Sequence, residues 1–148
     1  MPTRVRRATA ADTDALITLL DQGRHEIGID AHINLRSPEY RANFAHWCRE
    51  TATVQVWLTT DRAGAMVLLN HRTVQYIAVA TNRHREGIGR KLLTHAQKLC
   101  EQLDAETLST NICSQRLLLS CGFTHLGEKT KKERIWYDYY WCSRDWHD

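Results

Sequence analysis

The chain has 148 residues, of which 43% are hydrophobic and 25% charged, and its formal net charge is +3. These values are typical of a globular protein that buries a hydrophobic core, and we expect residues 1–148 to form a single domain. No apolar run approaches a membrane span and no signal-peptide core is present, so we expect a cytoplasmic protein without a membrane partner. The small positive charge suits a polyanionic ligand, and we expect no nucleic-acid partner.

In the first third of the chain, the pattern predicts one strand and two helices. The strand covers Arg4–Ala8, and Asp12 is a suitable N-cap for a helix that ends near Gly23. A serine-proline pair at 37–38 predicts the start of the second helix, because proline fits the first helical position. The segment 24–36 between these helices is polar and irregular.

Three strands are predicted in the middle of the chain, over residues 53–60, 65–69 and 74–79. The third strand leads through a polar loop to Gly87-Ile88-Gly89 and then to a helix with apolar residues at helical spacing. Glycine lets the backbone approach a ligand closely, and the first turn of a helix offers unpaired N–H groups and a positive dipole end. This layout predicts a site for a phosphorylated ligand.

Two common phosphate motifs do not fit this loop. A P-loop requires Gly-Lys-Ser/Thr, whereas Gly89 is followed by Arg90-Lys91-Leu92. The dinucleotide fingerprint requires a third glycine, and Leu92 stands at that position.

The last third predicts a strand at 106–110, a helix at 114–121, and a hairpin of strands 123–128 and 134–142 around a charged turn at 129–132. The final strand alternates two sets of side chains. One set is Trp136, Asp138 and Tyr140, and the other is Tyr137, Tyr139 and Trp141. Either one face is core and the other a surface or dimer patch, or the aromatic residues form a wall of an acceptor pocket.

The loop before the central helix resembles motif A of the GNAT superfamily of N-acetyltransferases, Gln/Arg-x-x-Gly-x-Gly/Ala. Both glycines match, while His84 takes the Gln/Arg position. Residues 111–123, NICSQRLLLSCGF, resemble motif B of the same superfamily, with matches at Asn111, Ser114, Gly122 and Phe123. The two motifs have the correct order and spacing, and the N-terminal segment VRRATAADTDAL is also similar to this family.

The resemblance implies an α/β fold with a mixed, mostly antiparallel sheet, flanked by about four helices and splayed at its central strands. It also implies acetyl-CoA as co-substrate. The main chain of the preceding strand would hold the pantetheine arm and polarise the thioester, through Ile77, Ala78 and Val79. The loop and the helix start would bind the pyrophosphate, through Arg85, Glu86, Gly87, Ile88, Gly89 and Arg90. The remaining phosphate would meet Arg83, Arg90 and Lys91.

Asn111 would bind the pantetheine amide, or it is a turn or helix-cap residue. The tyrosine that often serves as general acid in the family falls at Leu118, which cannot donate a proton. Tyr137 and Tyr139 are the candidates to replace it, although burial in a strand also explains them. Glu106 is the best-placed candidate base, with a surface glutamate as the alternative.

The strand before motif A offers two other polar side chains for this reaction. Thr73 and Gln75 occupy the inward phase of the strand before motif A, and neither is a good base. A relay through water would need no dedicated base. The acceptor pocket of the family often forms where His25, Glu26 and His32 lie in this sequence.

The resemblance therefore predicts transfer of acetyl from acetyl-CoA to a primary amine, by direct attack in a ternary complex, with a small molecule as acceptor and a monomer or homodimer as the assembly. A non-catalytic coenzyme-A-binding module is one alternative. Acetylation of a protein or transfer RNA is another, and a basic surface would support it, made by Arg4, Arg6, Arg7, Lys129, Lys131 and Lys132.

The five cysteines and eight histidines do not form a metal-ligand pattern, so no metal site is predicted. In a cytosolic chain we expect free thiols at every cysteine. These are Cys48, Cys100, Cys113, Cys121 and Cys142.

Overall fold

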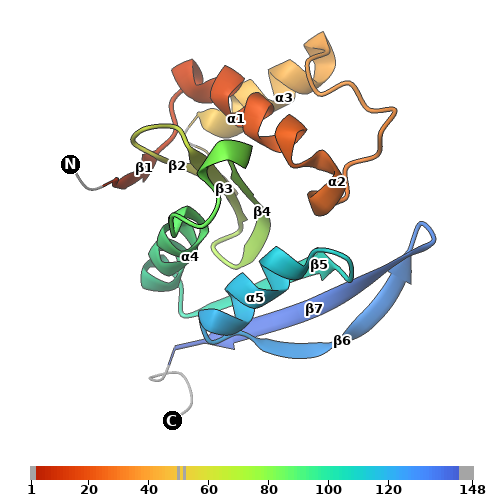
Figure 1. The fold of residues 1–148 in the computed structure, drawn as a ribbon. Helices are drawn as coiled ribbons and strands as arrows, with labels where there is room; N and C mark the ends of the chain where they lie inside the picture. The colour runs from red at the N-terminus through yellow and green to blue at the C-terminus, as the bar shows by residue number, and fades with distance from the viewer. Residues whose placement is uncertain (1–2, 50, 52, 144–148) are drawn as a thin grey trace.

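Seven strands form one sheet in the order β1-β2-β3-β4-β5-β7-β6 (Figure 1). The structure is a computed structural model that describes residues 3–49, 51 and 53–143. The strands are β1 Val5–Arg7, β2 Val54–Thr59, β3 Gly64–Leu69, β4 Thr73–Val79, β5 Gln102–Leu108, β6 Thr124–Lys131 and β7 Arg134–Cys142. Neighbouring strands are antiparallel except for β4 and β5, which are parallel. The predicted mixed, mostly antiparallel sheet is confirmed.

Helices cover both faces of the sheet. They are α1 Thr13–Gln22, α2 Arg24–Ile27, α3 Pro38–Cys48, α4 Ile88–Leu99 and α5 Ile112–Ser120, with two short 3-10 turns at Ala10–Asp12 and Thr81–Arg83. Side chains of α1 and α3 form one core cluster with β2 and β3, and side chains of α4 and α5 form a second cluster on the opposite face. The predicted α/β architecture is therefore a sheet between two helical layers.

Close approach of α4 to β3 needs a glycine. A Cβ atom on Gly64 would lie only 2.4 Å from Cγ2 of Ile88. Because real Cβ atoms do not approach so closely, Gly64 allows the first turn of α4 to pack on the end of β3. This contact fixes the position of the α4 N-terminus.

The central strands β4 and β5 separate soon after they begin. Their pairing is limited to Thr73 with Asp104 and Val74 with Ala105, although both strands continue beyond these residues. A register shift between Val67 and Leu68 of β3 leaves Gln75 without a partner on β3. Such an extra residue bends a strand and interrupts its ladder. The sheet is consequently open between the later parts of β4 and β5, as the resemblance implied.

Two predicted boundaries in the last third were wrong. The strand expected at 106–110 is β5, which begins at Gln102, because the alternation from Leu103 onward is that of a strand and α4 ends at Leu99. The charged turn expected at 129–132 is limited to Lys132 and Glu133, which have φ of 49° and 64°. Two consecutive left-handed residues make a tight hairpin turn, so Lys129 and Lys131 lie in β6.

Two N-terminal predictions also need correction. Residues 24–36, expected to be irregular, contain the single-turn helix α2. Asp12 precedes α1 as predicted, but its side chain makes no cap to that helix. Its carboxylate instead accepts hydrogen bonds from Arg6 and from the main-chain N–H of Thr9, at 2.8 Å each. Because the Asp12 carboxylate binds these donors, it does not cap α1.

Candidate functional site

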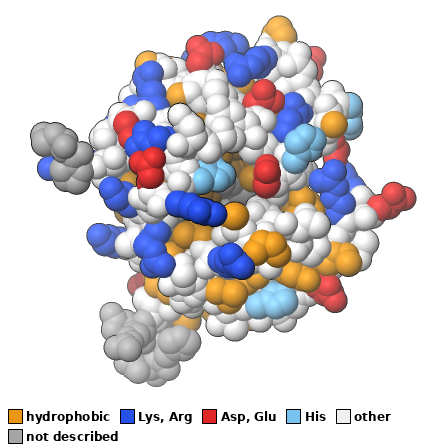
Figure 2. Space-filling model, in the orientation of Figure 1, with side chains coloured by type: hydrophobic (Ala, Val, Ile, Leu, Met, Phe, Trp, Pro, Cys, Tyr) orange, Lys and Arg blue, Asp and Glu red, His pale blue; other side chains and the backbone are white. Residues whose placement is uncertain are grey.

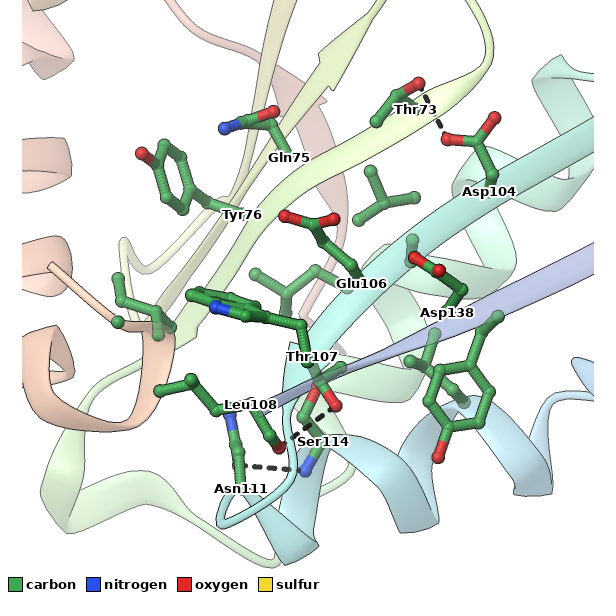
Figure 3. Close-up of a pocket in the computed structure, with 18 of the residues that line it drawn as sticks. Thr73, Gln75, Tyr76, Asp104, Glu106, Thr107, Leu108, Asn111, Ser114 and Asp138 are labelled. Carbon is green, nitrogen blue, oxygen red and sulfur yellow. Dashed lines mark hydrogen bonds between the residues drawn. The ribbon is translucent and has the colours of Figure 1, made fainter. Parts of the chain in front are cut away.

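A cavity of about 810 Å³ opens where β4 and β5 separate (Figure 3). Its lining comes from β4, β5, β6, β7, α5 and the segment after α1. Leu117 and Leu118 of α5 reach it from one face of the sheet, and Glu106 and Asp138 are part of its lining on the other. The cavity therefore passes through the gap in the sheet, and a ligand entering from one face could meet a ligand entering from the other.

Strand alternation gives the cavity a charged side. Leu103 and Ala105 of β5 are buried in the core under α4. The intervening residues Asp104 and Glu106 must point to the opposite face, because successive side chains of a strand alternate. Figure 3 shows Glu106 projecting from β5 toward β4, with Asp104 and Asp138 nearby.

Glu106 and Asp138 lie directly opposite each other on β5 and β7. Two facing carboxylates repel each other unless a cation lies between them. Lys129 supplies that cation, with its Nζ 2.7 Å from Glu106 Oε2 and 3.1 Å from Asp138 Oδ1. Lys131 donates a second hydrogen bond, to Glu106 Oε1, and its Nζ lies 4.7 Å from the centroid of the Trp136 ring.

These contacts set the charge of the cluster. Burial raises the pKa of Glu106, but the hydrogen bonds from Lys129 and Lys131 outweigh burial, so that its pKa is lowered overall. The hydrogen bond from Lys129 to Glu106, followed by the one to Asp138, raises the pKa of Lys129. Glu106 is therefore a carboxylate near neutral pH, which weakens it as a base and strengthens it as an anchor for a cation.

The N-terminus of α4 has the features of an anion site. Gly87 precedes the helix with a φ of 77°, and a Cβ atom there would have no heavy atom within 4 Å. Within the described residues no side chain caps the helix, and the main-chain N–H of Lys91 makes the first hydrogen bond back to Gly87. The N–H groups of Ile88, Gly89 and Arg90 precede that bond, so they can face a phosphate.

The basic side chains around this loop differ in their partners. Arg83 lies 2.6 Å from Glu86 and 3.1 Å from Asp61, and these hydrogen bonds raise its pKa. Lys91 donates to the main-chain oxygen of Thr3. Arg85 and Arg90 are exposed and make no ion pair with any residue that the structure describes. They are the cations of the predicted set that remain available.

The loop is adjacent to the cavity. Leu117 lines the cavity, and a Cβ on Gly89 would lie 3.0 Å from its Cδ2 atom. Ile77 also lines the cavity, whereas Val79 packs beside the core and the Ala78 side chain is buried toward α1. The predicted cofactor residues thus form one continuous region from β4 to the start of α4.

Asn111 has the helix-cap role that was one of its two predicted alternatives. Its Oδ1 accepts from the main-chain N–H of Ser114 and caps α5, as Figure 3 shows, while its Nδ2 donates to the main-chain oxygen of Glu26. Asn111 also lines the cavity. The cap fixes its side chain at the place where β5 ends.

The two candidate acids lie in different environments. Tyr139 lines the cavity but is only 3% exposed, and burial, followed by the neighbouring Tyr137, raises its pKa. Tyr137 does not line the cavity, and both rings pack beside His125. Leu118 is buried in the core at the cavity wall.

Of the three residues predicted to lie at the acceptor pocket, only one lines the cavity. Glu26 lines the cavity, whereas His25 and His32 do not. After α2 the chain turns at Gly28, where a Cβ atom would lie 2.5 Å from Cη2 of Trp136. This contact between Gly28 and Trp136 was not predicted. The available signal was a glycine between two isoleucines, Ile27 and Ile29.

The predicted basic surface is largely neutralised by acids. Arg6 pairs with Asp12, Lys129 and Lys131 pair with Glu106, and Lys132 lies 3.6 Å from Asp30. Figure 2 shows both Lys or Arg and Asp or Glu side chains on the face that it presents. Four of the six predicted cations are therefore paired with carboxylates.

No disulfide bond joins the cysteines among the described residues, in agreement with the prediction of thiols, and burial raises the pKa of Cys48 and Cys100. Within the described part of the chain, no group of His, Cys, Asp and Glu has the arrangement of a metal site. None of the helices that the structure describes is long and apolar enough to cross a membrane.

Comparison with known proteins gives a family and a fold. The model of the acetyltransferase (GNAT) domain matches residues 38–140. No curated protein sequence matches the chain. An acetyltransferase from Salmonella typhimurium, solved with its cofactor acetyl-CoA, has a TM-score of 0.73 at 21% identity, and the match covers 96% of this chain and 94% of that one.

Two other similar structures differ in what their names say they acetylate. A spermidine N-acetyltransferase from Vibrio cholerae has a TM-score of 0.74 at 15% identity, over 95% of this chain and 93% of that one. A ribosomal-protein-alanine N-acetyltransferase from Brucella melitensis has a TM-score of 0.70 at 20% identity, over 94% and 99%. The TM-scores of these structures establish a shared fold.

Proposed function

The chain belongs to the GNAT family of acetyltransferases, which use acetyl-CoA as co-substrate, and on that premise we propose that it acetylates a primary amine of a small molecule. It is an acyltransferase. The observation that supports the proposal most strongly is the cavity through the gap between β4 and β5, which adjoins the open N-terminus of α4.

The α4 end of this region is proposed to hold the cofactor. The first N–H groups of α4 would bind the pyrophosphate, and Arg85 and Arg90 would add charge-assisted hydrogen bonds. Ile77 and Asn111 line the cavity beyond the loop, where the pantetheine arm would lie. Gly87 leaves open space for this approach.

The reaction requires a neutral amine. Its nitrogen attacks the carbonyl carbon of the thioester, the C–N bond forms and the C–S bond breaks, and the sulfur leaves with the electron pair and takes up a proton. An acceptor that begins as an ammonium therefore releases one proton to solvent overall. Glu106 is proposed to hold the amine as its ammonium form, and because its lowered pKa makes Glu106 a weak base, the proton would leave the amine through water.

The cavity supports a small acceptor. Its volume of about 810 Å³ lies in the range of small-molecule sites. A macromolecular acceptor remains the second candidate, because the fold is shared with an enzyme named for a ribosomal protein. The paired lysines and arginines of the expected basic surface favour the small molecule.

A combined binding and turnover experiment tests the proposal. Acetyl-CoA should raise the melting temperature, because it binds the native state. Release of coenzyme A thiol in the presence of a panel of small primary amines should then identify the acceptor. A melting shift without thiol release from any amine would favour a non-catalytic module, and no shift at millimolar acetyl-CoA would contradict the proposal.

A further inference from the structure

Two lysines of the chain itself occupy the charged side of the cavity. Lys129 lies between Glu106 and Asp138, and Lys131 lies between Glu106 and the ring of Trp136. Each is a primary ammonium on a flexible alkyl chain. The Lys131 position therefore displays how this cavity binds an alkylammonium group.

The charge of the cavity differs from that of the whole chain. The chain carries a net charge of +3, whereas the cavity lining contains more acids than bases. The acids are Glu26, Asp104, Glu106, Glu128 and Asp138, and the bases are Arg72, Lys129 and Lys131. Among the described residues, Glu26 makes no ion pair, whereas Glu128 pairs with Tyr137 across β6 and β7 and therefore points to the face opposite Lys129 and Glu106. An acidic cavity in a basic protein favours a cationic ligand.

The geometry around Lys131 is that of a recognition site for an ammonium. A carboxylate supplies a charge-assisted hydrogen bond, and an aromatic face lies at cation–π distance, 4.7 Å from Nζ. Both partners are held by the fold. Glu106 lies in β5, which pairs with β7 along its whole length, and Trp136 packs against Gly28.

Lys131 itself is weakly held. Its side chain is 45% exposed, and it directly precedes the two-residue turn of the hairpin formed by β6 and β7. Exposed ion pairs contribute little stability, since water screens them and a long side chain must be ordered. A ligand ammonium can therefore take its place at small cost, and Lys129 would still separate Glu106 from Asp138.

We propose that the acceptor is an aliphatic amine whose ammonium group replaces Lys131 between Glu106 and Trp136. This proposal rests on the proposed acetyltransferase function and specifies its acceptor class. The bound ammonium is the recognition group, and Glu26, which also lines the cavity, favours an acceptor with a second positive charge. The chemistry is that of a free aliphatic diamine or a lysine side chain.

Removal of the competing lysine gives the most specific test. In Lys131→Met the alkyl chain remains but the cation is lost, so the KM for 1,5-diaminopentane should fall about two- to fivefold. A purely structural role for Lys131 would raise KM or leave it unchanged. The matched control is Lys132→Met, since Lys132 is adjacent, loses the same charge and does not line the cavity.

The opposite result is expected when the anchor is removed. Glu106→Gln should raise the KM for the diamine about 10- to 100-fold, because a hydrogen bond to a charged group is lost. The dissociation constant for coenzyme A, measured by calorimetry, should be unchanged in all three variants. An amine with a carboxylate in place of the second ammonium, 5-aminopentanoate, should be a poorer acceptor than the diamine.

Each outcome has a defined meaning. Failure of coenzyme A to bind contradicts the proposed function, whereas unchanged KM in Lys131→Met with normal cofactor binding contradicts only the acceptor proposal. If thiol release is absent, calorimetry of the diamine with the coenzyme-A-loaded protein applies the same test to binding. A lysyl peptide that binds better than the diamine in Lys131→Met would identify a protein lysine as the source of the ammonium.

Discussion

Two carboxylates in this protein each lie between two cations, and they differ in almost every other respect. Asp12 accepts hydrogen bonds from both Nη atoms of Arg6 at 2.8 Å, from Nε of Arg62 at 3.0 Å and from the main-chain N–H of Thr9. Its side chain is 1% exposed, whereas that of Glu106 is 35% exposed. Glu106 meets only the terminal ammonium groups of two lysines.

The difference lies in the donors and in the chain that carries them. The planar fork of Arg6 matches both oxygens of Asp12 and fixes the end of β1 against the start of α1. A lysine ammonium is a point charge on four rotatable bonds, and both lysines come from β6, at the edge of the sheet. The Asp12 cluster joins elements of the fold, whereas the Glu106 cluster is held weakly enough for a ligand cation to replace Lys131, as proposed above.

Neutralising each carboxylate should separate the two clusters most clearly. Asp12→Asn should lower the free energy of unfolding by about 3 kcal/mol, because it leaves a buried site without its charge partner. Glu106→Gln should lower it by less than about 1 kcal/mol. Urea unfolding of both variants measures the difference, and equal losses would contradict the comparison.

The cofactor loop should be independent of both clusters. Gly87→Val places a side chain in the open space before α4 and should weaken acetyl-CoA binding at least about tenfold, or about 1.4 kcal/mol. Gly122→Val is the control, because it has the same left-handed strain, with φ of 89°, away from the cavity. The melting shift produced by acetyl-CoA should survive in this control and in Glu106→Gln. If the melting shift is also lost in Gly122→Val, destabilisation of the fold would explain the loss in Gly87→Val.

The pH dependence of stability should also separate the two clusters. The hydrogen bond from Arg6 is the main cause of the lowered pKa of Asp12, and the native state therefore binds fewer protons than the unfolded state near pH 4. The stability that the ionised Asp12 contributes to the native state is present above about pH 4 and is lost as the pH falls further. Acid titration of unfolding should show a steeper decline for the wild type than for Asp12→Asn. Identical slopes would contradict this assignment.

The smallest effects are expected at the two tyrosines. Tyr139→Phe should reduce kcat by less than about a hundredfold, and Tyr137→Phe should leave it almost unchanged, because only Tyr139 lines the cavity. Saturating acetyl-CoA and a known acceptor are needed for this measurement. A larger loss at Tyr139 with unchanged cofactor affinity would identify it as the general acid in place of Leu118.

The region around the α4 N-terminus could be predicted from the sequence. The apolar run before Val79, the glycines at 87 and 89 and the helical spacing after them are local signals. The structure shows a strand, a left-handed Gly87 and a helix at these positions. Local patterns succeed there because neighbouring residues determine the backbone conformation.

The partners of Glu106 could not be predicted in the same way. Lys129 and Lys131 were predicted to lie in a charged turn and on a basic surface. The two-residue turn at Lys132 and Glu133 extends β6, and the pairing of β5, β7 and β6 then brings both lysines to Glu106. Strand register across three strands depends on contacts between residues far apart in the chain, which local patterns do not record.

The sequence by itself determined the family motifs, the alternation of strands and helices and the strand-glycine-helix layout at the start of α4. Only the tertiary structure decided that Glu26, Glu106, Asp138 and Trp136 surround one cavity. It also decided that Asp12 joins parts of the fold instead of capping α1. The physical reason is that the energy of a charge depends on its burial and on its partners, and both are set by packing between distant segments.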